Sequence, residues 1–129
     1  MKIEHLAIWV DDLESMRNFY IKYFGASSNS KYTNVLKQFS SYFLSFEEGT
    51  ARIELMQKPH ILANNELRGN VKGLAHFAIS VGSKEKVIAL TEQLRKDGFK
   101  IYDEPRTTGD GYYESIVLDP EGNFIEITI

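Results

Sequence analysis

The chain has 129 residues, of which 43% are hydrophobic and 26% charged, a composition typical of one soluble globular domain or of two small modules sharing a core. Its 15 Lys and Arg and 18 Asp and Glu give a net charge of −3 without long runs of one sign, which excludes the basic surface of a nucleic-acid binder. The chain contains no cysteine, which excludes disulfides, thiolate metal ligands and a cysteine nucleophile.

No stretch approaches the ~20 apolar residues that are needed to span a bilayer. The first apolar run is interrupted by Glu4 and His5, so it does not resemble a signal peptide. We therefore expect a cytoplasmic protein that binds neither membranes nor nucleic acids.

Two short sequence patterns occur twice, in the same order and at nearly the same offset. Residues 5–10 (HLAIWV) resemble 76–81 (HFAISV), and residues 52–55 (RIEL) resemble 124–127 (FIEI). Such self-similarity predicts a duplicated structural module. We expect a single domain built from one module over residues 1–57, a polar linker over 58–71 and a second module over 72–129.

Each module is predicted to have the element order βαβββ. In the first, Asp11 and Asp12 can cap a helix that ends at Gly25, and its apolar stripe is Leu13, Met16, Tyr20 and Tyr23. In the second, Ser83 can cap a helix that ends at Gly98, and its stripe is Val87, Leu90 and Leu94. Runs rich in Val, Ile, Tyr and Phe predict further strands over 42–46, 52–56, 99–102, 113–118 and 123–129.

Because side chains alternate along a strand, each module has one aliphatic sheet face and one face that carries His and Glu. The second face holds His5 and Glu54 in the first module and His76 and Glu126 in the second, at equivalent positions of the repeat. Carboxylates beside apolar side chains need a compensating cation or hydrogen-bond network. Neutral imidazoles and carboxylates suit Zn, Ni, Co, Mn or Fe, so the set predicts a divalent-metal site with open coordination positions.

The alternative is that each His is an ordinary structural residue and each Glu lies on a solvated face. This is the simpler explanation for any one residue, whereas equivalence by repeat favours the metal for the set. Other side chains on or near this face are predicted to contact substrate: Trp9, Arg52, Met56 and Phe124, with Arg106 and Tyr113 from a loop over 104–113. That loop either closes over an anionic substrate or is an ordinary Gly-rich turn.

With these residues the chain resembles the vicinal oxygen chelate superfamily, which includes glyoxalase I, fosfomycin-resistance enzymes, extradiol dioxygenases and bleomycin-resistance proteins. The resemblance covers essentially the whole chain and rests on the His-x-Ala-Ile opening of both modules and on LDPEGNFIE at residues 118–126. It implies an α+β fold in which two tandem βαβββ modules form a curved, cup-like mixed sheet. It also implies that the metal ligands lie on the first and last strands of each module.

Within the superfamily the chain is most similar to glyoxalase I (lactoylglutathione lyase), because Glu54 adds a fourth ligand to His5, His76 and Glu126. The resemblance implies a divalent-metal-dependent isomerase or lyase that acts on a small substrate with vicinal oxygens through an enediolate. One metal would lie in each cup, and Glu126 or Glu54 would be the catalytic base. It also implies a homodimer, with the cup formed within one chain or across two.

One departure concerns the substrate. Glyoxalase I enzymes of bacterial type have Arg and Asn where this chain has Trp9 and Lys58, which favours an aromatic or apolar substrate portion over glutathione. Two alternative functions remain open. The protein is either another metalloenzyme of the superfamily, such as a thiol transferase or a dioxygenase, or a metal-free resistance protein that binds a small molecule.

Overall fold

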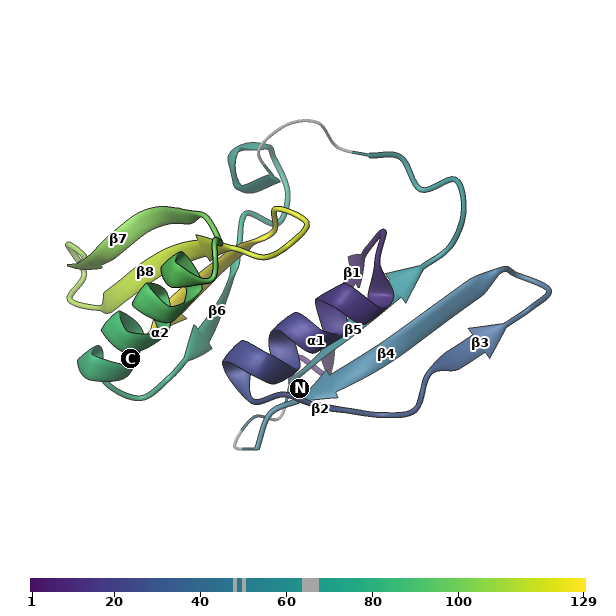
Figure 1. The fold of residues 1–129 in the computed structure, drawn as a ribbon, viewed down its shortest axis with the longest axis horizontal. Coiled ribbons are helices and arrows are strands. Elements are labelled where there is room, and N and C mark those ends of the chain that lie inside the picture. The colour runs from purple at the N-terminus through teal and green to yellow at the C-terminus, as the bar shows by residue number, and fades with distance from the viewer. Residues whose placement is uncertain (48, 50, 64–67) are drawn as a thin grey trace. The chain divides into compact units, whose positions relative to one another are not determined.

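The computed structural model describes the chain except for residues 48, 50 and 64–67 (Figure 1). The chain divides into two compact units, Met1–Ala63 and Asn64–Ile129, which we call module 1 and module 2. The described residues form two α-helices, one 3-10 helix and nine strands, so the predicted α+β class is confirmed.

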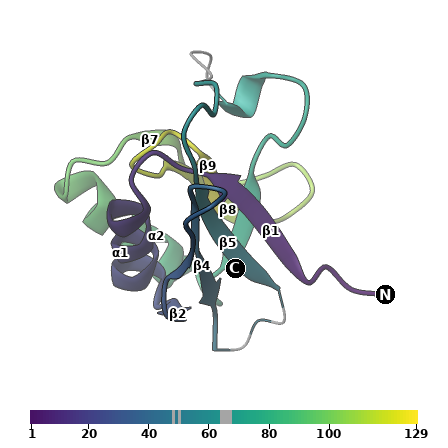
Figure 2. The ribbon, with the colours of Figure 1, turned by 90° about the vertical axis from the view of Figure 1, so that its right-hand side faces the viewer.

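Module 1 contains β1 (His5–Trp9), α1 (Leu13–Phe24), β2 (Ser27–Ser28), β3 (Tyr32–Asn34), β4 (Phe39–Ser45) and β5 (Arg52–Gln57). Its sheet has the strand order β1-β5-β4-β2, and β3 also pairs with β4. The β1–β5 pair is parallel and the other pairs are antiparallel. In Figures 1 and 2, α1 lies along one face of this sheet, where it contacts β4 and β5.

Helix α1 begins and ends at the predicted residues. The Asp12 side chain accepts a hydrogen bond from the Ser15 amide at 3.0 Å, and Gly25 ends the helix in the left-handed region at φ 64°. The buried stripe differs in one position from the prediction. Phe19 is buried, whereas Tyr23 is half-buried at the last turn, with its ring centroid 5.1 Å from that of Phe19. The stripe therefore consists of Leu13, Met16, Phe19 and Tyr20.

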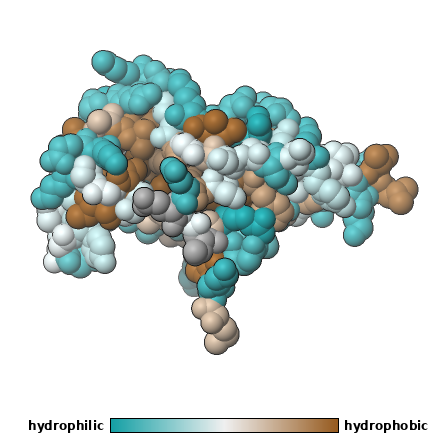
Figure 3. Space-filling model, turned by 90° about the horizontal axis from the view of Figure 1, so that it is seen from below, coloured by the Kyte–Doolittle hydropathy of each residue, from teal (hydrophilic) through white to brown (hydrophobic). Residues whose placement is uncertain are grey.

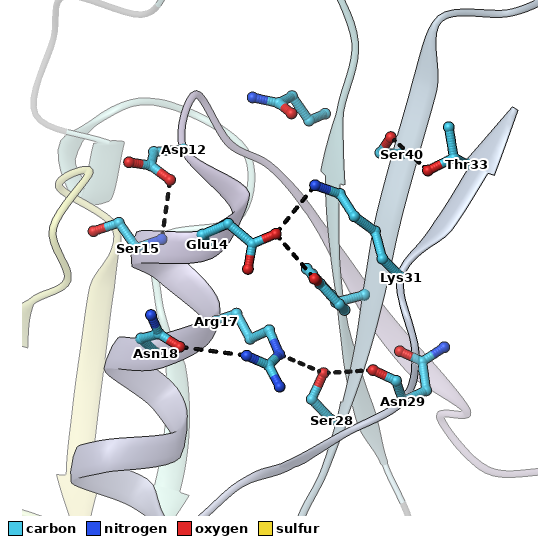
Figure 4. Close-up of polar contacts among 12 residues, drawn as sticks. Asp12, Glu14, Ser15, Arg17, Asn18, Ser28, Asn29, Lys31, Thr33 and Ser40 are labelled. Atoms are coloured by element: carbon cyan, nitrogen blue, oxygen red, sulfur yellow. Dashed lines mark hydrogen bonds and ion pairs between the residues drawn. The ribbon is translucent and has the colours of Figure 1, made fainter. Parts of the chain in front are cut away.

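Polar contacts also fix α1 to the sheet of module 1 (Figure 4). The Glu14 carboxylate accepts hydrogen bonds from Lys31 Nζ at 3.1 Å and from the Tyr42 hydroxyl at 2.9 Å. One turn later, Arg17 Nε donates to Ser28 Oγ at 3.0 Å. The hydrogen bond from Lys31, followed by that from Tyr42, lowers the pKa of the Glu14 carboxyl.

Module 2 contains η1 (Arg68–Asn70), β6 (Phe77–Ser80), α2 (Lys84–Lys96), β7 (Ile101–Thr107), β8 (Tyr113–Leu118) and β9 (Phe124–Thr128). Its sheet has the strand order β6-β9-β8-β7, with β6 and β9 parallel and the other pairs antiparallel. From β6 onward the element order is βαβββ, as predicted. Module 1 keeps the same plan, with the short β2 in the place of β7, and adds one further short strand, β3.

Helix α2 has the predicted cap, since Ser83 Oγ accepts from the Lys86 amide at 3.3 Å. Its buried stripe contains Thr91 where Leu90 was predicted. The Thr91 hydroxyl donates to the Val87 carbonyl at 2.7 Å and lies 2.7 Å from the Ser115 hydroxyl on β8. A polar residue is therefore buried here because its hydrogen bonds are satisfied inside the core.

Two segments differ from the sequence-based prediction. Residues 27–40, in which no strand was predicted, contain β2, β3 and the start of β4, which are short and polar and so lack a hydrophobic alternation. The first part of the predicted loop 104–113 belongs to β7, whose register against β8 shifts twice between Ile101 and Arg106. Such irregularities interrupt the two-residue period from which a strand is predicted.

The turn between β3 and β4 exposes two aliphatic side chains, Val35 at 82% and Leu36 at 98%. Figure 3 shows apolar residues at the right-hand end of the molecule, the side on which Figure 1 places this turn. None of the described helices is long and apolar enough to cross a membrane.

Candidate metal centre

In module 1, the strand register places His5 and Glu54 on the same sheet face. His5 pairs with Arg52 and Ala7 pairs with Glu54 across β1 and β5, and Phe43 on β4 pairs with Glu54 from the other side. Paired residues of neighbouring strands share a face. The opposite face is the aliphatic one that packs under α1, and it carries the buried Ile8, Leu44, Ile53 and Leu55.

The His5 ring faces the Glu54 carboxylate with one nitrogen and Glu4 with the other. His5 Nε2 lies 3.7 Å from Glu54 Oε2, which is too long for a hydrogen bond. His5 Nδ1 is hydrogen-bonded to the Glu4 carboxylate, which also forms an ion pair with Arg52. The hydrogen bond with His5 lowers the pKa of Glu4 and the Arg52 contact adds to this effect, while partial desolvation opposes it.

Module 2 repeats this arrangement. His76 directly precedes β6, and its Nε2 lies 3.3 Å from Glu126 Oε2 on β9. Ala78 and Ile116 pair with Glu126 from the two neighbouring strands, just as Ala7 and Phe43 flank the carboxylate of module 1. The two Glu side chains are shielded to the same extent, at 15% and 16% exposure. Equivalent positions in the repeat are therefore shielded to a similar extent.

A further carboxylate, which the sequence analysis missed, lies close to Glu126. Glu114 on β8 has a side chain only 13% exposed, and Arg106 Nη1 lies 3.4 Å from its Oε1. Desolvation raises the pKa of Glu126 and the negative charge of Glu114 raises it further, while His76 acts in the opposite direction. Part of the signal for this residue lies in the sequence, because Glu114 and Ile116 are two residues apart in the predicted strand and so share a face. Ile116 is the register partner of Glu126.

The two His–Glu pairs fit ligands of a small divalent cation. Two ligand atoms each about 2.0–2.2 Å from one ion lie roughly 3.0–3.5 Å apart at common coordination angles. The observed separations of 3.7 Å and 3.3 Å are close to this range. Within the described residues of each module, neither carboxylate pairs with Lys or Arg, and no third His, Asp or Glu joins the pair. Each pair therefore supplies two ligands by itself.

Three of the predicted substrate-contacting residues lie on the His5 face of module 1. Trp9 and Met56 are paired across β1 and β5, two positions along from Glu54. Lys58 Nζ lies 5.0 Å above the Trp9 ring, a cation–π contact. Arg52 covers the Phe43 ring, with its guanidinium carbon 4.1 Å from the ring centre.

A shallow pocket of about 240 Å³ opens where β1 and β5 end in module 1. Its lining is mainly polar and comes from three stretches of chain: Val10, Asp11, Gln38, Ser40, Gln57, Lys58 and Pro59. Lys58 is the one cationic residue in that set. Sequence analysis did not predict the pocket, because turn residues distant in sequence form it together.

The other three predicted substrate-contacting residues belong to module 2. Phe124 is two residues from Glu126 on β9 and shares its sheet face. It is only 4% exposed, because its ring packs against Gly69 of η1 and Tyr102 of β7. Tyr113 shares the strand face of the buried Ser115, and its ring lies 5.0 Å from Lys84 Nζ at the start of α2. Arg106 pairs with Glu114 and, at 2.6 Å, with Asp103.

Two modules with the βαβββ plan, each with one parallel pair of strands, define the glyoxalase fold, and solved structures agree. Trypanothione-dependent glyoxalase I of Leishmania major aligns with a TM-score of 0.78 and 24% identity over 99% of this chain and 86% of that one. A glyoxylase/bleomycin resistance protein/dioxygenase domain from Frankia sp. EAN1pec aligns with a TM-score of 0.82 and 18% identity over 100% and 97%.

Sequence comparison gives the family. Residues 2–127 match the Glyoxalase/Bleomycin resistance protein/Dioxygenase superfamily, and the chain belongs to this superfamily. A trivalent organoarsenical cleaving enzyme from Bacillus sp. (strain MD1) is 30% identical over 131 residues, which cover 95% of this chain and 70% of that protein. The resemblance drawn from the sequence is therefore confirmed at the level of the superfamily.

Proposed function

We propose that this protein is a divalent-metal-dependent enzyme of the glyoxalase I type, which moves a proton between neighbouring carbons of a small substrate with vicinal oxygens. The proposal is carried by the shielded carboxylates of Glu54 and Glu126, each of which faces an imidazole nitrogen at an equivalent position of the repeat. Shielded anions of this kind cost free energy unless a cation compensates them. In this proposal His5, Glu54, His76 and Glu126 together bind one Zn, Ni, Co, Mn or Fe ion.

When bound, the metal ion would supply positive charge that acidifies the substrate C–H next to the vicinal oxygens. A Glu carboxylate of this chain takes that proton as a general base and returns it to the neighbouring carbon. Oε2 is the carboxylate oxygen nearer the imidazole in both Glu54 and Glu126, which leaves Oε1 for the proton. Ala7 and Ala78, the register partners of these residues, leave space beside each carboxylate because their side chains are single methyl groups.

The substrate of this proposal has an apolar or aromatic part and an anionic end. Trp9 and Met56 offer an apolar surface on the His5 face of module 1. Lys58 lies over the Trp9 ring and lines the neighbouring pocket, where its charge can bind a carboxylate or phosphate. Arg106 is the weaker candidate for this role, because Asp103 and Glu114 already pair with it.

A solvent-isotope experiment tests the proposed reaction. The metal-loaded protein is given adducts of α-ketoaldehydes with several thiols in D₂O, and the product is examined by NMR. We expect turnover with partial transfer of deuterium to carbon, and a loss of turnover of about 10²- to 10⁴-fold when the base is replaced in Glu126→Gln or Glu54→Gln. Circular dichroism verifies folding, and Glu14→Gln, a change on α1, is the matched control. Full turnover in both variants would contradict the proposed role of these carboxylates.

The similarity to the organoarsenical cleaving enzyme from Bacillus sp. (strain MD1) favours a second candidate function, the cleavage of trivalent organoarsenicals. This chain has no cysteine, so it offers no thiolate, the soft ligand that trivalent arsenic prefers. For this reason we rank it behind proton transfer. Release of inorganic arsenic from a trivalent organoarsenical by the Fe-loaded protein, lost under anaerobic conditions, would reverse the ranking.

We also propose that the protein is a homodimer, and complementation tests which chain supplies each half of the ligand set. One variant lacks the ligands of module 1 (His5→Ala with Glu54→Ala), and the other lacks those of module 2 (His76→Ala with Glu126→Ala). If each set combines ligands from two chains, mixing the variants restores activity to part of the mixture. If one chain supplies all four ligands, the mixture stays inactive.

A further inference from the structure

We propose that Glu4 is a positioning residue that selects the tautomer of His5 and so turns the Nε2 lone pair toward Glu54. This inference rests on the proposed metal site, since it states how module 1 prepares one of its ligands. Glu4 lies outside the predicted ligand set and directly precedes β1.

The geometry is a closed cycle of contacts within module 1. His5 Nδ1 is hydrogen-bonded to Glu4, and the same carboxylate is paired with Arg52. The Arg52 guanidinium lies over the Phe43 ring at 4.1 Å, and Phe43 meets the His5 ring edge to face with centroids 5.4 Å apart. The Arg52 amide also donates to the Glu4 carbonyl at 3.0 Å, which extends the β1–β5 pairing by one residue. Both the backbone and the side chain of Glu4 are therefore held in place.

The chemistry follows from the donor and acceptor inventory of the imidazole. A neutral imidazole carries one N–H and one lone pair, and a carboxylate can only accept a hydrogen bond. A hydrogen bond from Nδ1 to Glu4 therefore places the proton on Nδ1 and the lone pair on Nε2, 3.7 Å from Glu54 Oε2. Carboxylates that bind the second nitrogen of a metal-ligating His act in this way, because they fix both the tautomer and the ring orientation.

Module 2 supplies an internal comparison. The residue before His76 is Ala75, which has no side-chain acceptor, so the position equivalent to Glu4 is apolar. In the described part of module 2, the His76 ring has one polar contact, from Nε2 to Glu126. The two halves of the repeat thus differ in the carboxylate beside the ring.

The tautomer can be measured in the metal-free protein by long-range ¹H–¹⁵N NMR, at a pH well above the ordinary imidazole pKa. We expect His5 to carry its proton on Nδ1 and His76 to carry it mainly on Nε2, as free histidine does. In Glu4→Ala, His5 should revert to the Nε2–H form. Glu4→Gln should retain Nδ1–H in part, because the amide oxygen still accepts a hydrogen bond.

Metal affinity is the second readout. Glu4→Ala should weaken Co²⁺ binding by about 10- to 100-fold, the usual effect of removing such a partner, and Glu4→Gln should weaken it less. Glu14→Gln removes the same charge from module 1 without touching His5, and it should leave both the tautomer and the affinity unchanged.

The two readouts separate this inference from the proposed function. An Nε2–H tautomer of His5 in the wild type, or a tautomer that does not change in Glu4→Ala, would overturn the role of Glu4 whether or not metal binds. A wild-type protein that binds no Co²⁺ but shows the Nδ1–H form, lost in Glu4→Ala, would support the role of Glu4 and contradict the proposed metal site.

Discussion

Replacing Gly69 by Ala should destabilise module 2, because the glycine lies directly against the Phe124 ring. A Cβ atom built on Gly69 would lie 2.4, 2.6 and 2.8 Å from the Cδ2, Cε2 and Cγ atoms of that ring. Phe124 is 4% exposed, and the Tyr102 ring packs on it with centroids 4.5 Å apart, so the ring has little freedom to move. The φ angle of Gly69 is outside the left-handed region, so an Ala backbone is not itself strained there.

The expected loss in the free energy of unfolding is about 1–3 kcal/mol. Forcing an extra methyl group into a packed contact typically costs about that much. If η1 instead lifts away from the sheet, the Phe124 ring becomes exposed, and burial of a Phe side chain contributes roughly 1.5–3 kcal/mol. The two ranges overlap, so the prediction does not depend on which route the chain takes.

Chemical unfolding followed by circular dichroism measures this loss, since the only tryptophan, Trp9, reports on module 1. Gly109→Ala is the matched control, because a Cβ there has no heavy atom within 4 Å. We expect it to be neutral or stabilising by up to about 1 kcal/mol. In a Phe124→Ala background, the cost of Gly69→Ala should disappear. A Gly69→Ala protein as stable as the wild type would refute the covering of Phe124 by η1.

Three further predictions concern stability. Thr91→Val should cost about 1–3 kcal/mol because it leaves the buried Ser115 hydroxyl without its partner, and adding Ser115→Ala should recover most of the loss in a chemical unfolding experiment. The pKa of Glu14 is lowered from 4.5, chiefly by the hydrogen bond from Lys31. The charged Glu14 carboxylate therefore stabilises the folded protein above this ordinary value, and the stabilisation is lost as the pH falls through the lowered pKa. Glu14→Gln should flatten this part of the profile of unfolding free energy against pH. Leu36→Ser should change the unfolding free energy by less than about 0.5 kcal/mol, because the side chain is 98% exposed, and a larger loss would show that the turn is covered.

The sequence predicted those features that depend on local periodicity. Alternation along the predicted strands placed each His–Glu pair on the face opposite the aliphatic core. The β1–β5 register agrees for His5 and Glu54, and His76 Nε2 lies 3.3 Å from Glu126 Oε2 in module 2. The caps of α1 and α2 were predicted correctly because their signals are side chains next to the helix ends, Asp12 and Ser83.

The features that the sequence did not predict depend on contacts between distant residues or on departures from periodicity. The contact between Glu4 and His5 is one example, since neighbouring side chains within a strand point to opposite faces, but Glu4 precedes β1. The burial of Phe124 is another, because Gly69 meets it from 55 residues earlier in the chain. Thr91 was overlooked because its hydroxyl becomes compatible with the core only when Ser115 and the Val87 carbonyl satisfy it.

The fold alone does not determine the reaction, because one fold can carry several chemistries and function depends on the site. The relatives illustrate this, since they include a glyoxalase I and an organoarsenical cleaving enzyme. The specific observations that favour proton transfer in this chain are the two carboxylates, Glu54 and Glu126, and the absence of cysteine.

The metal content of the tag-free protein tests the central claim most directly. The protein is stripped of metal, reconstituted separately with Zn, Ni, Co, Mn and Fe, and analysed by elemental mass spectrometry beside two double variants, His5→Ala/Glu54→Ala and His76→Ala/Glu126→Ala. The four-ligand site predicts about one ion per chain in the wild type and in the Glu14→Gln control, and loss of that ion in both double variants. A wild type that binds none of the five metals, or a double variant that keeps its ion, would contradict the account.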